Sequence, residues 1–586
     1  MVTVAQYIVK YLEDYGIKHC FSVVGGGAMF LNNAFGNSEK IKPVYMHHEQ
    51  ACAIAAEGYS RITNQLSVVC ITTGPGGLNT LTGVMGQWTD SMPVLYISGQ
   101  VDTKTIKTPD MRQLGDQEIN IIDIVSPITK YAEIVSNPYD IKYQLDQAIH
   151  YATYKRNGPV WLDIPLNIQN TVIDETKLEG YDRNKNVIGC HNSIISEAIL
   201  KEIQKSKKPL IIAGHGIRLA DAREEFYKIL NLINIPVATT FNGFDLLPDT
   251  HGNYIGRVGS LGSRGANKIL QECDLLICLG TRNNVRQIGY NSTNFAPQAK
   301  KIIVDIDKTE LDKKHMRGDI SIYSDLKYFL LTLLYIIGNL NNGEWDHIQW
   351  LSYCKTLFHK YPLVDTIHKD TKIDGLNPYV FTNELSECLP EDAVVVCGNG
   401  TACVSMFQSG IVKNMNQRFF WNSGTASMGY DIPAAIGAHF ASGKEIILLT
   451  GDGSIMMNLQ ELQTIAHYHL PIKIFILNNG GYHSIIQTQT KFCNGQIKGC
   501  DQDSGVSFPS FYEIANTFGL SFYDIDNNMS LPLQLQQVKT IVQSPAIIDV
   551  KISRDYIFAP RLSSEKKSDG TIVQGSFENM YPYEVE

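Results

Sequence analysis

The sequence predicts an α/β protein made of three consecutive doubly wound parallel-sheet domains. Short apolar runs alternate with helical patterns along most of the 586 residues. Many of these runs stop at glycine, asparagine or aspartate, which is typical of strand ends at the ligand-binding edge of a parallel sheet. The chain is also long enough for roughly three or four domains of ordinary size.

The composition is that of an ordinary globular protein, with 44% apolar and 19% charged residues. The net charge of −9 argues against a surface that binds nucleic acid. The 12 cysteines include no CxxC pair and no zinc-ligand spacing, so we expect free thiols in a reducing compartment. The N-terminus lacks a signal-peptide pattern, and the longest apolar run, residues 328–338, is too short to span a bilayer. We therefore expect a cytoplasmic protein without nucleic-acid or membrane partners.

The first elements establish the α/β rhythm. Thr3 and Gln6 form the capping box of a helix that Gly16 ends. A strand at residues 19–24 then runs into three glycines around Gly26, which we assign to close approach of backbone at the edge of a site. Further strands of this part are expected at residues 67–72, 92–99 and 158–165.

Between these strands, residues 44–61 predict a short strand that leads into an alanine-rich helix. Glu49 lies at their junction. A carboxylate in that position is either a favourable charge at a helix N-terminus or a buried catalytic acid. The residues alone leave both interpretations open.

The rest of the chain repeats the pattern twice. A polar, irregular stretch at 163–207 predicts a linker. Strands are expected after it at 209–214, 274–280, 301–307, 393–397 and 546–552, and helices at 323–337 and 380–388. We predict domains at residues 1–175, 190–345 and 370–555, and a C-terminal tail at 556–586.

The most specific stretch is residues 448–484. Two apolar runs flank a helical pattern and stop at the sequences GDGS (451–454) and NNGG (478–481). Because neighbouring parallel strands end on the same edge of a sheet, Asp452 and Asn479 are expected to face one ligand. Glycines admit backbone close to that ligand, a helix N-terminus binds anions, and Asp and Asn oxygens suit Mg²⁺. The stretch predicts a metal-bridged diphosphate site, and an ordinary α/β crossover with glycine-rich turns is the alternative.

The spacing from GDG to NN resembles the signature of thiamine-diphosphate (ThDP) enzymes. Together with HEQ, AEGYSR, TTGPGGLN, GPVWLDIP and WNSGTASMGYDIPAAIGA in that order, it resembles the acetolactate synthase family over about residues 1–555. The resemblance implies a pyrimidine-binding, a central and a diphosphate-binding domain. It also implies a homodimer or homotetramer, because in that family each cofactor lies between the pyrimidine domain of one subunit and the diphosphate domain of another.

The same resemblance assigns cofactor contacts by position. Asp452, the Asn479 side chain and the backbone oxygen of Gly481 look like Mg²⁺ ligands. Met428 matches the bulky residue beneath the cofactor, with a plain core methionine as the alternative. The Ala426 carbonyl matches the acceptor for the pyrimidine amino group. The other contacts implied are Gly26, Glu49, Pro75, Asn79, Gly400, Thr401, Ala402, Gly451, Gly453, Ser454, Asn479, Gly481 and Tyr482.

The resemblance also gives Glu49 a catalytic role. Activation of the cofactor carbon needs a nearby base, and the cofactor's own amine serves only if a carboxyl group bound to the pyrimidine nitrogen promotes the imino form. Gln117 and Lys130 are the other catalytic candidates. Lys130 fits the family pattern, although a solvated surface charge is the alternative.

Three positions depart from the family pattern. Asp116 replaces an apolar ring beside Gln117, and Ser484 and Thr488 stand where acetolactate synthases carry Met and Trp. The acceptor side therefore looks wider and more polar than a second pyruvate requires. We hypothesise transfer of an acyl group from a 2-oxo acid, pyruvate, to a larger polar carbonyl acceptor such as a keto sugar on a nucleotide. Acetolactate synthase proper, a pyruvate oxidase-type flavin enzyme, a simple decarboxylase and a non-catalytic homologue are the alternatives.

FAD is a separate prediction. The family's central domain often binds it structurally, and two segments of this chain resemble the contact segments. Arg286 fits the family pattern, and the alternative interpretation is a solvated surface charge. The candidate FAD residues are Arg264, Gly265, Gly280, Arg282, Arg286 and Asp305.

Overall fold

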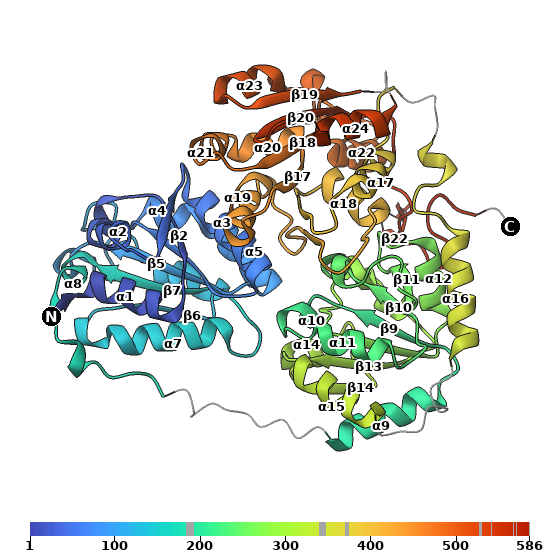
Figure 1. Cartoon of the computed structure of the whole chain (residues 1–586), viewed down its shortest axis with the longest axis horizontal. Coiled ribbons are helices and arrows are strands. Elements are labelled where there is room, and N and C mark those ends of the chain that lie inside the picture. The colour runs from blue at the N-terminus through green and yellow to red at the C-terminus, as the bar shows by residue number, and fades with distance from the viewer. Residues whose placement is uncertain are drawn as a thin grey trace.

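The computed structural model describes residues 1–182, 193–338, 347–369, 374–526, 530–540, 542–566, 568–569 and 571–584. Within these ranges three six-stranded sheets follow one another along the chain, and all strand pairs in them are parallel (Figure 1). Helices lie on both faces of each sheet, so the predicted fold class is confirmed.

The N-terminal sheet has the order β3-β2-β4-β5-β7-β6. Its strands are β2 (His19–Ser22), β3 (Lys42–Tyr45), β4 (Ser67–Ile71), β5 (Val94–Gln100), β6 (Tyr131–Ile134) and β7 (Val160–Pro165). Its helices are α1 (Val4–Tyr15), α2 (Met29–Gly36), α3 (Glu49–Thr63), α4 (Pro75–Asn79), α5 (Leu81–Asp90), α6 (Ile121–Val125) and α7 (Ile141–Thr153). The capping box predicted at Thr3 and Gln6 is present, and Gly16 ends α1 in the left-handed conformation.

The central sheet has the order β11-β10-β9-β12-β13-β14. Its strands are β9 (Pro209–Ala213), β10 (Val237–Thr239), β11 (Tyr254–Arg257), β12 (Leu275–Leu279), β13 (Lys300–Asp305) and β14 (Ile320–Tyr323). Its helices are α9 (Ser193–Lys205), α10 (Gly216–Leu219), α11 (Arg223–Leu230), α12 (Arg264–Glu272), α13 (Val285–Ile288), α14 (Lys308–Asp312), α15 (Leu326–Gly338) and α16 (Ile348–Lys360).

The third sheet has the order β16-β15-β17-β18-β20-β19. Its strands are β15 (Val394–Cys397), β16 (Arg418–Phe420), β17 (Ile446–Gly451), β18 (Ile472–Asn478), β19 (Ser521–Ile525) and β20 (Ala546–Lys551). Its helices are α17 (Pro378–Cys388), α18 (Thr401–Ser409), α19 (Asp431–Ser442), α20 (Asp452–Ile455), α21 (Glu461–His467), α22 (His483–Phe492), α23 (Phe511–Phe518) and α24 (Leu531–Thr540).

Each sheet has one position where the chain crosses over in opposite directions to its two sides. That switch point lies between β2 and β4, between β9 and β12, and between β15 and β17. In open α/β sheets ligands bind outside the carboxyl ends of the strands at such a point. The fold therefore offers three candidate sites, one on each sheet.

Helices α3 and α19 join the first part of the chain to the third, and Figure 1 shows them at the centre of the molecule. They pack almost backbone to backbone. A Cβ atom on Gly437 would lie 1.8 Å from the carbonyl oxygen of Ala55, and one on Gly58 would lie 2.3 Å from that of Ala434. Only glycine allows this approach, so these two positions fix how the two sheets are arranged.

The C-terminal tail folds back over the rest of the chain. It forms a small antiparallel pair, β21 (Ser564–Lys566) and β22 (Ile572–Gln574). Leu562, Phe577 and Met580 join the core of the central part. In Figure 1 the tail runs between α18 and the central sheet.

The predicted linker at 163–207 was wrong in part. It contains α8 (Leu166–Gln169) and the strand β8 (Val172–Ile173), which pairs with β1 (Val2–Thr3), and its last third is the helix α9. Ile199, Leu200 and Ile203 of α9 are buried against the central sheet. The polar composition concealed this face because only one side of the helix is apolar.

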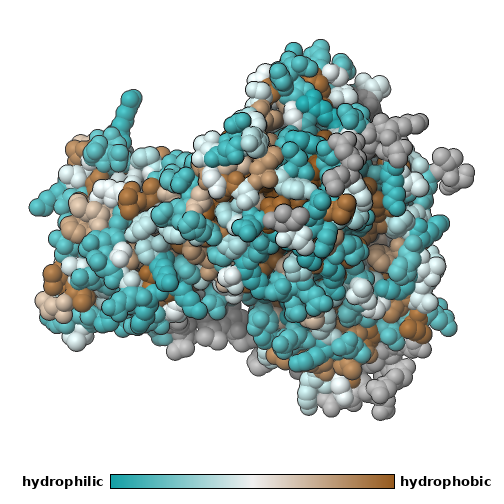
Figure 2. Space-filling model, turned by 45° about the horizontal axis from the view of Figure 1, so that its top comes forward, coloured by the Kyte–Doolittle hydropathy of each residue, from teal (hydrophilic) through white to brown (hydrophobic). Residues whose placement is uncertain are grey.

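Within the described residues, no helix is long and apolar enough to cross a membrane. Figure 2 shows hydrophilic side chains over much of one face, with hydrophobic side chains in small groups among them. The cysteines that the structure describes are all free, as the sequence predicted for them.

We predict that Gly437→Ala destabilises the protein although alanine normally stabilises a helix. The new Cβ meets rigid backbone, so α3 and α19 must separate, and overpacking of this kind costs about 1–3 kcal/mol. Thermal unfolding measures the effect. Gly252→Ala is the matched control, because a Cβ there meets nothing within 4 Å. An unchanged melting temperature for Gly437→Ala would contradict this account of the interface.

Candidate functional site

Asp452 joins two loops at the switch point of the third sheet. It follows β17, and its Oδ2 atom accepts hydrogen bonds from the backbone N–H groups of Asn479 (3.0 Å), Gly480 (2.6 Å) and Gly481 (3.1 Å) after β18. Oδ1 accepts from the N–H of Gly453 at 2.7 Å. Burial nevertheless raises the pKa of Asp452 to about 6. The structure thus brings together Asp452, Asn479 and Gly481, the three predicted metal ligands.

The residues after Asp452 are packed tightly. A Cβ on Gly453 would lie 2.1 Å from the ring of Tyr482, so only glycine fits beneath this ring. Ser454 is buried, and its hydroxyl accepts a hydrogen bond from the N–H of Gly429 at 3.0 Å. The start of α20 is therefore fixed against the loop that carries Met428.

The turn from β15 into α18 lies on the other side of the same switch point. Gly400 has a φ of 85°, which favours glycine, and Ala402 is buried. The Thr401 and Tyr556 hydroxyls lie 2.5 Å apart, so the tail contacts this turn. Ala426 has a φ of 55°, and Met428 is half-buried, which leaves it room to contact a ligand.

These residues fit a magnesium diphosphate. An added Cβ would meet nothing within 4 Å at Gly451, and at Gly400 only the Ser484 hydroxyl at 3.8 Å, so both turns face open space. No cluster of three His, Cys, Asp or Glu side chains that could hold a metal occurs in the described part of the chain. One carboxylate with amide and backbone oxygens is the donor set by which Mg²⁺ is held when phosphates complete its shell.

The N-terminal sheet carries a second group of predicted residues. Asn79 donates a hydrogen bond to Glu49 Oε2 at 3.0 Å, and Pro75 opens the helix that bears Asn79. A Cβ on Gly74 would lie 2.2 Å from the Gln117 carbonyl oxygen, so Gln117 lies against the same turn. A Cβ on Gly26 would meet nothing within 4 Å. Glu49 is half-buried and lies beside these turns, since a Cβ on Gly76 would lie 3.6 Å from its Oε1 atom.

Lys130 is separate from this group. Its ammonium donates to the carbonyl oxygens of Tyr154 at 2.7 Å and Arg156 at 2.6 Å, and burial lowers its pKa to about 8. It braces the segment before β7. The structure gives it no contact with Glu49 or Gln117 among the described residues.

Within one chain the two groups remain apart. No hydrogen bond or ion pair among the described residues joins Glu49, Asn79 or Gln117 to the loops around Asp452. Flanking residues connect the two regions: Asn458 donates to Gln50 Oε1 at 3.0 Å, the His47 N–H donates to Glu461 Oε1 at 3.1 Å, and the Thr89 and Thr425 hydroxyls lie 3.0 Å apart.

Sequence reasoning missed Arg554. Its Nε atom donates to the carbonyl oxygen of Asn479 at 2.6 Å, and Nη2 donates to that of Gly480 at 2.7 Å. Nη1 lies 3.6 Å from Asp501 Oδ2. Arg554 thus holds the loop that carries two predicted metal ligands, and no motif in the tail indicated it.

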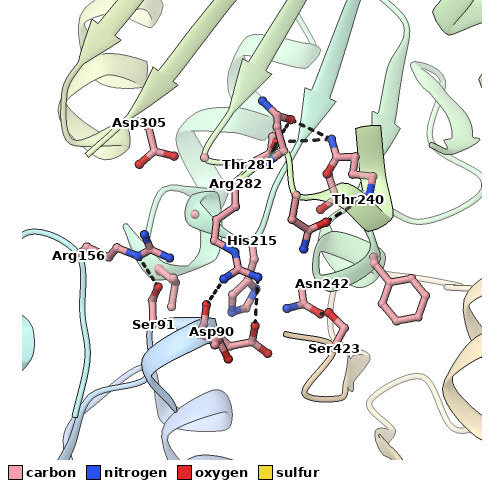
Figure 3. A pocket seen from close by; sticks show the side chains of 18 of the residues that line it. Asp90, Ser91, Arg156, His215, Thr240, Asn242, Thr281, Arg282, Asp305 and Ser423 are labelled. Carbon is pink, nitrogen blue, oxygen red and sulfur yellow. Dashed lines mark hydrogen bonds and ion pairs between the residues drawn. The ribbon is translucent and has the colours of Figure 1, made fainter. Parts of the chain in front are cut away.

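A cavity lies at the switch point of the central sheet, where the three parts of the chain meet (Figure 3). It holds about 1160 Å³ of atom-free space when its open mouth is included. Gly280, Arg282, Arg286 and Asp305 of the predicted FAD residues line it. Burial raises the pKa of Asp305 to about 6.

Arg264 and Gly265 do not line this cavity. Arg264 donates to the carbonyl oxygens of Met580 and Pro582 in the tail, and Gly265 packs against Leu357 of α16. The sequence could not show this, because the partner of Arg264 is more than 300 positions away.

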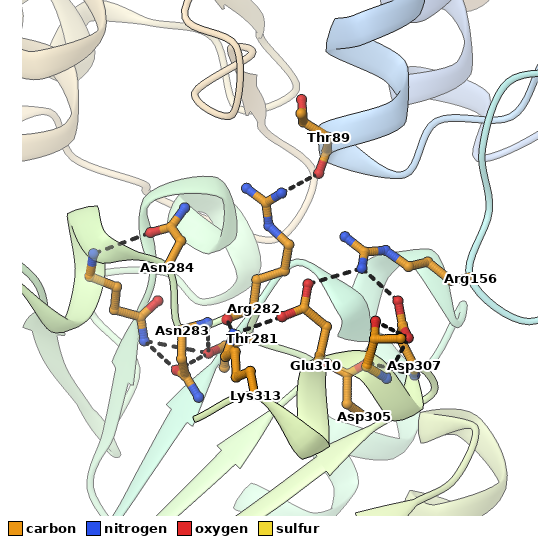
Figure 4. Close-up of polar contacts among 12 residues, drawn as sticks. Thr89, Arg156, Thr281, Arg282, Asn283, Asn284, Asp305, Asp307, Glu310 and Lys313 are labelled. Carbon is orange, nitrogen blue, oxygen red and sulfur yellow. Dashed lines mark hydrogen bonds and ion pairs between the residues drawn. The ribbon is translucent and has the colours of Figure 1, made fainter. Parts of the chain in front are cut away.

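Charged side chains connect the cavity wall to the first part of the chain. Figure 4 shows Arg282 reaching the carbonyl oxygen of Thr89 at 2.6 Å, and Arg156 pairing with Asp307 at 2.7 Å and Glu310 at 2.9 Å. His215 lines the cavity too, and neither ring nitrogen has a partner among the described residues. Burial lowers the pKa of His215 well below its usual value, so the imidazole is neutral.

Comparisons with known proteins agree with this geometry. Residues 2–124 match the family model "Thiamine pyrophosphate enzyme, N-terminal TPP binding domain", residues 196–333 the central-domain model and residues 398–550 the C-terminal TPP-binding-domain model. Acetolactate synthase large subunit from Corynebacterium glutamicum is 32% identical over 96% of this chain and 89% of its own length. The Cyanidium caldarium protein of that name is 31% identical over 96% and 95%. A probable acetolactate synthase large subunit from Methanocaldococcus jannaschii is 33% identical over 94% and 91%.

We predict that Arg554→Lys weakens metal and diphosphate binding. Lysine keeps the charge but cannot donate to the Asn479 and Gly480 carbonyl oxygens together. The apparent affinity of the apoprotein for Mg²⁺ with ThDP is expected to fall about tenfold, as for loss of one charge-assisted hydrogen bond. Titration followed by tryptophan fluorescence measures it.

Arg317→Lys is the control for this prediction, since Arg317 is exposed and lies in the central part. Equal affinities for wild type and Arg554→Lys would show that the loop is held without the guanidinium.

Proposed function

This chain belongs to the ThDP-dependent acetolactate synthase family of carboligases, and we propose that it joins the acetyl group of pyruvate to a larger, polar carbonyl acceptor. In this reaction the bond between the two carbonyl carbons of pyruvate breaks and CO₂ leaves. A new bond forms to the acceptor's carbonyl carbon, and the acceptor oxygen takes up a proton. A keto sugar carried on a nucleotide is the acceptor that we favour.

The observation that carries this proposal is the polar wall beside the diphosphate turn. Ser484 lies next to Gly400, and Thr488 lies one helical turn further along α22 on the same face. Both side chains are small hydroxyls, and Thr488 is exposed. Hydroxyls at these positions leave space and hydrogen-bonding capacity where Met and Trp of acetolactate synthases would close the site.

The loop with Asp116 adds to this argument. Asp116 is exposed next to Gln117, and the buried Glu118 holds the loop by accepting from the N–H groups of Lys107 at 3.2 Å and Leu114 at 3.0 Å. The Asp116 carboxylate therefore extends from a fixed loop beside the pyrimidine half of the site. A carboxylate there favours a hydroxylated acceptor over a second 2-oxo acid, which carries the same charge.

In this proposal ThDP, when bound, supplies the carbon nucleophile and the electron sink for decarboxylation. Asp452, Asn479 and the Gly481 carbonyl would hold the Mg²⁺. Arg554 keeps their loop in place. Glu49, oriented by Asn79, would hold the proton exchanged with the pyrimidine nitrogen. We retain the domain boundaries 1–175, 190–345 and 370–555 for these roles, with the tail at 556–586.

We also propose that two chains complete each site. The half-site with Glu49 carries exposed apolar residues at Val24, Met29 and Leu78, and the half-site with Asp452 carries Met457 and Ile485. Exposed apolar side chains around two incomplete halves favour burial against a second copy. A symmetric dimer would form two equivalent sites at once.

We propose that the cavity on the central sheet holds FAD. Arg282 and Arg286 offer positive charge for a diphosphate, and Gly280 admits backbone approach beside them. Asp305, at the end of β13, is placed to accept hydrogen bonds from ribose hydroxyls. The flavin would join the three parts of the chain, which all contribute to the wall.

Acetolactate synthase proper is the second candidate. It is favoured by the names of relatives that match nearly the whole chain at about 31–33% identity. In that case a second pyruvate is the acceptor, and acetolactate is the product.

We predict that product analysis separates these two functions. With labelled pyruvate and a panel of carbonyl acceptors, mass spectrometry is expected to show acetylated keto sugar as the main product. The double variant Ser484→Met with Thr488→Trp should narrow the acceptor side and raise the acetolactate share at least about tenfold. Thr490→Trp, on the opposite face of α22, is the control. Efficient acetolactate formation by wild type from pyruvate alone would favour the second candidate.

A mixed-subunit experiment tests the shared site. Glu49→Gln and Asp452→Ala are each expected to lose nearly all activity as pure dimers. A heterodimer of the two variants has one site with both defects and one intact site, so about half of wild-type activity should return. Two different affinity tags allow its isolation. A heterodimer as inactive as its parents would show that Glu49 and Asp452 act within the same chain.

A further inference from the structure

The outer end of the polar wall on α22 carries positive charge. Ser484, Thr488 and Lys491 follow one another at spacings of four and three residues, so they lie on one face of α22. The helix rises 1.5 Å per residue, which places Lys491 about 10 Å beyond Ser484. The face therefore begins with hydroxyls at the diphosphate turn and ends with an ammonium group.

The C-terminal tail adds a second cation beside the first. Arg561 Nη1 donates to Gln487 Oε1 at 3.5 Å, and Lys491 donates to the Ser563 hydroxyl at 3.1 Å. The two contacts lie next to each other along α22. Their helix residues, Gln487 and Lys491, are four positions apart, which corresponds to a rise of about 6 Å along the helix axis.

Alternation along the tail explains why these two residues face α22. Leu562, between Arg561 and Ser563, donates its N–H to Ser260 and is buried in the central core. In extended chain successive side chains point to opposite sides, so Arg561 and Ser563 point away from that core and toward α22. The Arg561 backbone is fixed by two hydrogen bonds with Tyr581.

The charge of Arg561 is not neutralised by any carboxylate among the described residues. Its guanidinium lies over the Tyr581 ring, 5.7 Å from the centroid, and its one polar side-chain contact is the amide oxygen of Gln487. Arg561 on the tail and Lys491 on α22 thus make adjacent contacts between the same two segments, beside a hydroxyl-lined face, and such a pair of cations is suited to bind phosphate oxygens.

We propose that Lys491 and Arg561 bind the phosphate groups of the acceptor, and that the acceptor is therefore a phosphate-bearing sugar of the nucleoside diphosphate type. This inference rests on the proposed function and narrows its substrate class. Ser484 and Thr488 would contact the sugar end near the cofactor, and the two cations would bind the far end. Lys491 and Arg561 are specificity-determining residues that lie away from the reacting carbon.

The direct test uses uridine diphosphate as the probe on the holoenzyme. ThDP and Mg²⁺ are kept saturating, so the cofactor's own diphosphate site is filled. Calorimetric titration is expected to show binding that weakens about tenfold or more in Lys491→Gln and in Arg561→Gln, as for loss of a charge-assisted contact. Uridine, which lacks phosphate, should bind wild type and variants equally weakly.

Two control variants separate anion binding from attachment of the tail. Lys498→Gln removes an exposed charge in the loop after α22 and should leave the affinity within about twofold. Ser563→Ala removes the hydrogen bond between Lys491 and the Ser563 hydroxyl but keeps both charges, so it should also leave the affinity unchanged. Equal losses in Ser563→Ala and Lys491→Gln would overturn the proposal, as would a holoenzyme that does not bind uridine diphosphate.

Activity measurements distinguish this inference from the proposed function. With a nucleotide-linked keto sugar, the two charge variants are expected to raise KM about tenfold with little change in kcat, and the KM for pyruvate should stay constant. A wild-type enzyme that forms only acetolactate would refute the proposed acceptor whatever the binding result. Transfer to keto sugars with KM unaffected by Lys491→Gln and Arg561→Gln would refute the phosphate contacts alone.

Discussion

The contacts of a single carboxylate define the candidate active site. Asp452 accepts three N–H groups from the loop after β18 and one from its own turn, so it joins the carboxyl ends of two neighbouring strands. The N–H groups of Gly480 and Gly481 each have a second acceptor, the side-chain oxygens of Asn478 at 3.2 Å and Asn479 at 3.1 Å. Loss of the carboxylate would still remove four hydrogen bonds from a partly buried loop, which is costly. Within this loop the Asn479 side-chain oxygen accepts from the Gly481 N–H at 3.1 Å, and the Gly481 carbonyl oxygen accepts from the His483 N–H at 3.0 Å. Both the hydrogen bonding of this loop and the predicted metal site therefore depend on Asp452.

The topology explains why this site and the central cavity both exist. The first and third sheets share one strand order, and the central sheet has the order of a dinucleotide-binding fold. At each switch point two loops diverge and leave a crevice. Glycines face open space in the first and third crevices at Gly26, Gly400 and Gly451, which admit a ligand close to the backbone. In the central crevice Gly280 instead allows close packing against Gly216 and Leu326. The close contact between α3 and α19 then fixes the first and third crevices relative to each other.

Much of the fold and part of the site follow from local pattern. Apolar runs and their glycine ends gave the bounds of the predicted strands to within about two residues, and parallel-sheet geometry placed Asp452 beside Asn479. The strands β6, β10, β11, β14, β16 and β19 were not predicted. Local sequence pattern could not show contacts between segments that lie far apart along the chain. Arg264 resembled a flavin contact but is bound to the tail, and Arg554 acts through carbonyl oxygens of a loop 74 positions earlier. No motif indicated Arg554, and the segment around Arg264 does not show its contact with the tail, since any arginine on a suitably placed backbone could make such contacts.

The tail gives these long-range contacts a common origin. Arg554 contacts the loop after β18, which carries two predicted metal ligands, and Tyr556 contacts the turn at Thr401. A few residues later, Leu562 is buried in the central core. Beyond that point Met580 and Pro582 accept hydrogen bonds from Arg264. One segment thus spans the candidate cofactor site, the polar face of α22 and the central part. Because an extended segment anchored at both ends has little freedom, the side chains between the anchors are held in place. Arg561 and Ser563, the tail residues that contact α22, therefore lie in an anchored part of the tail.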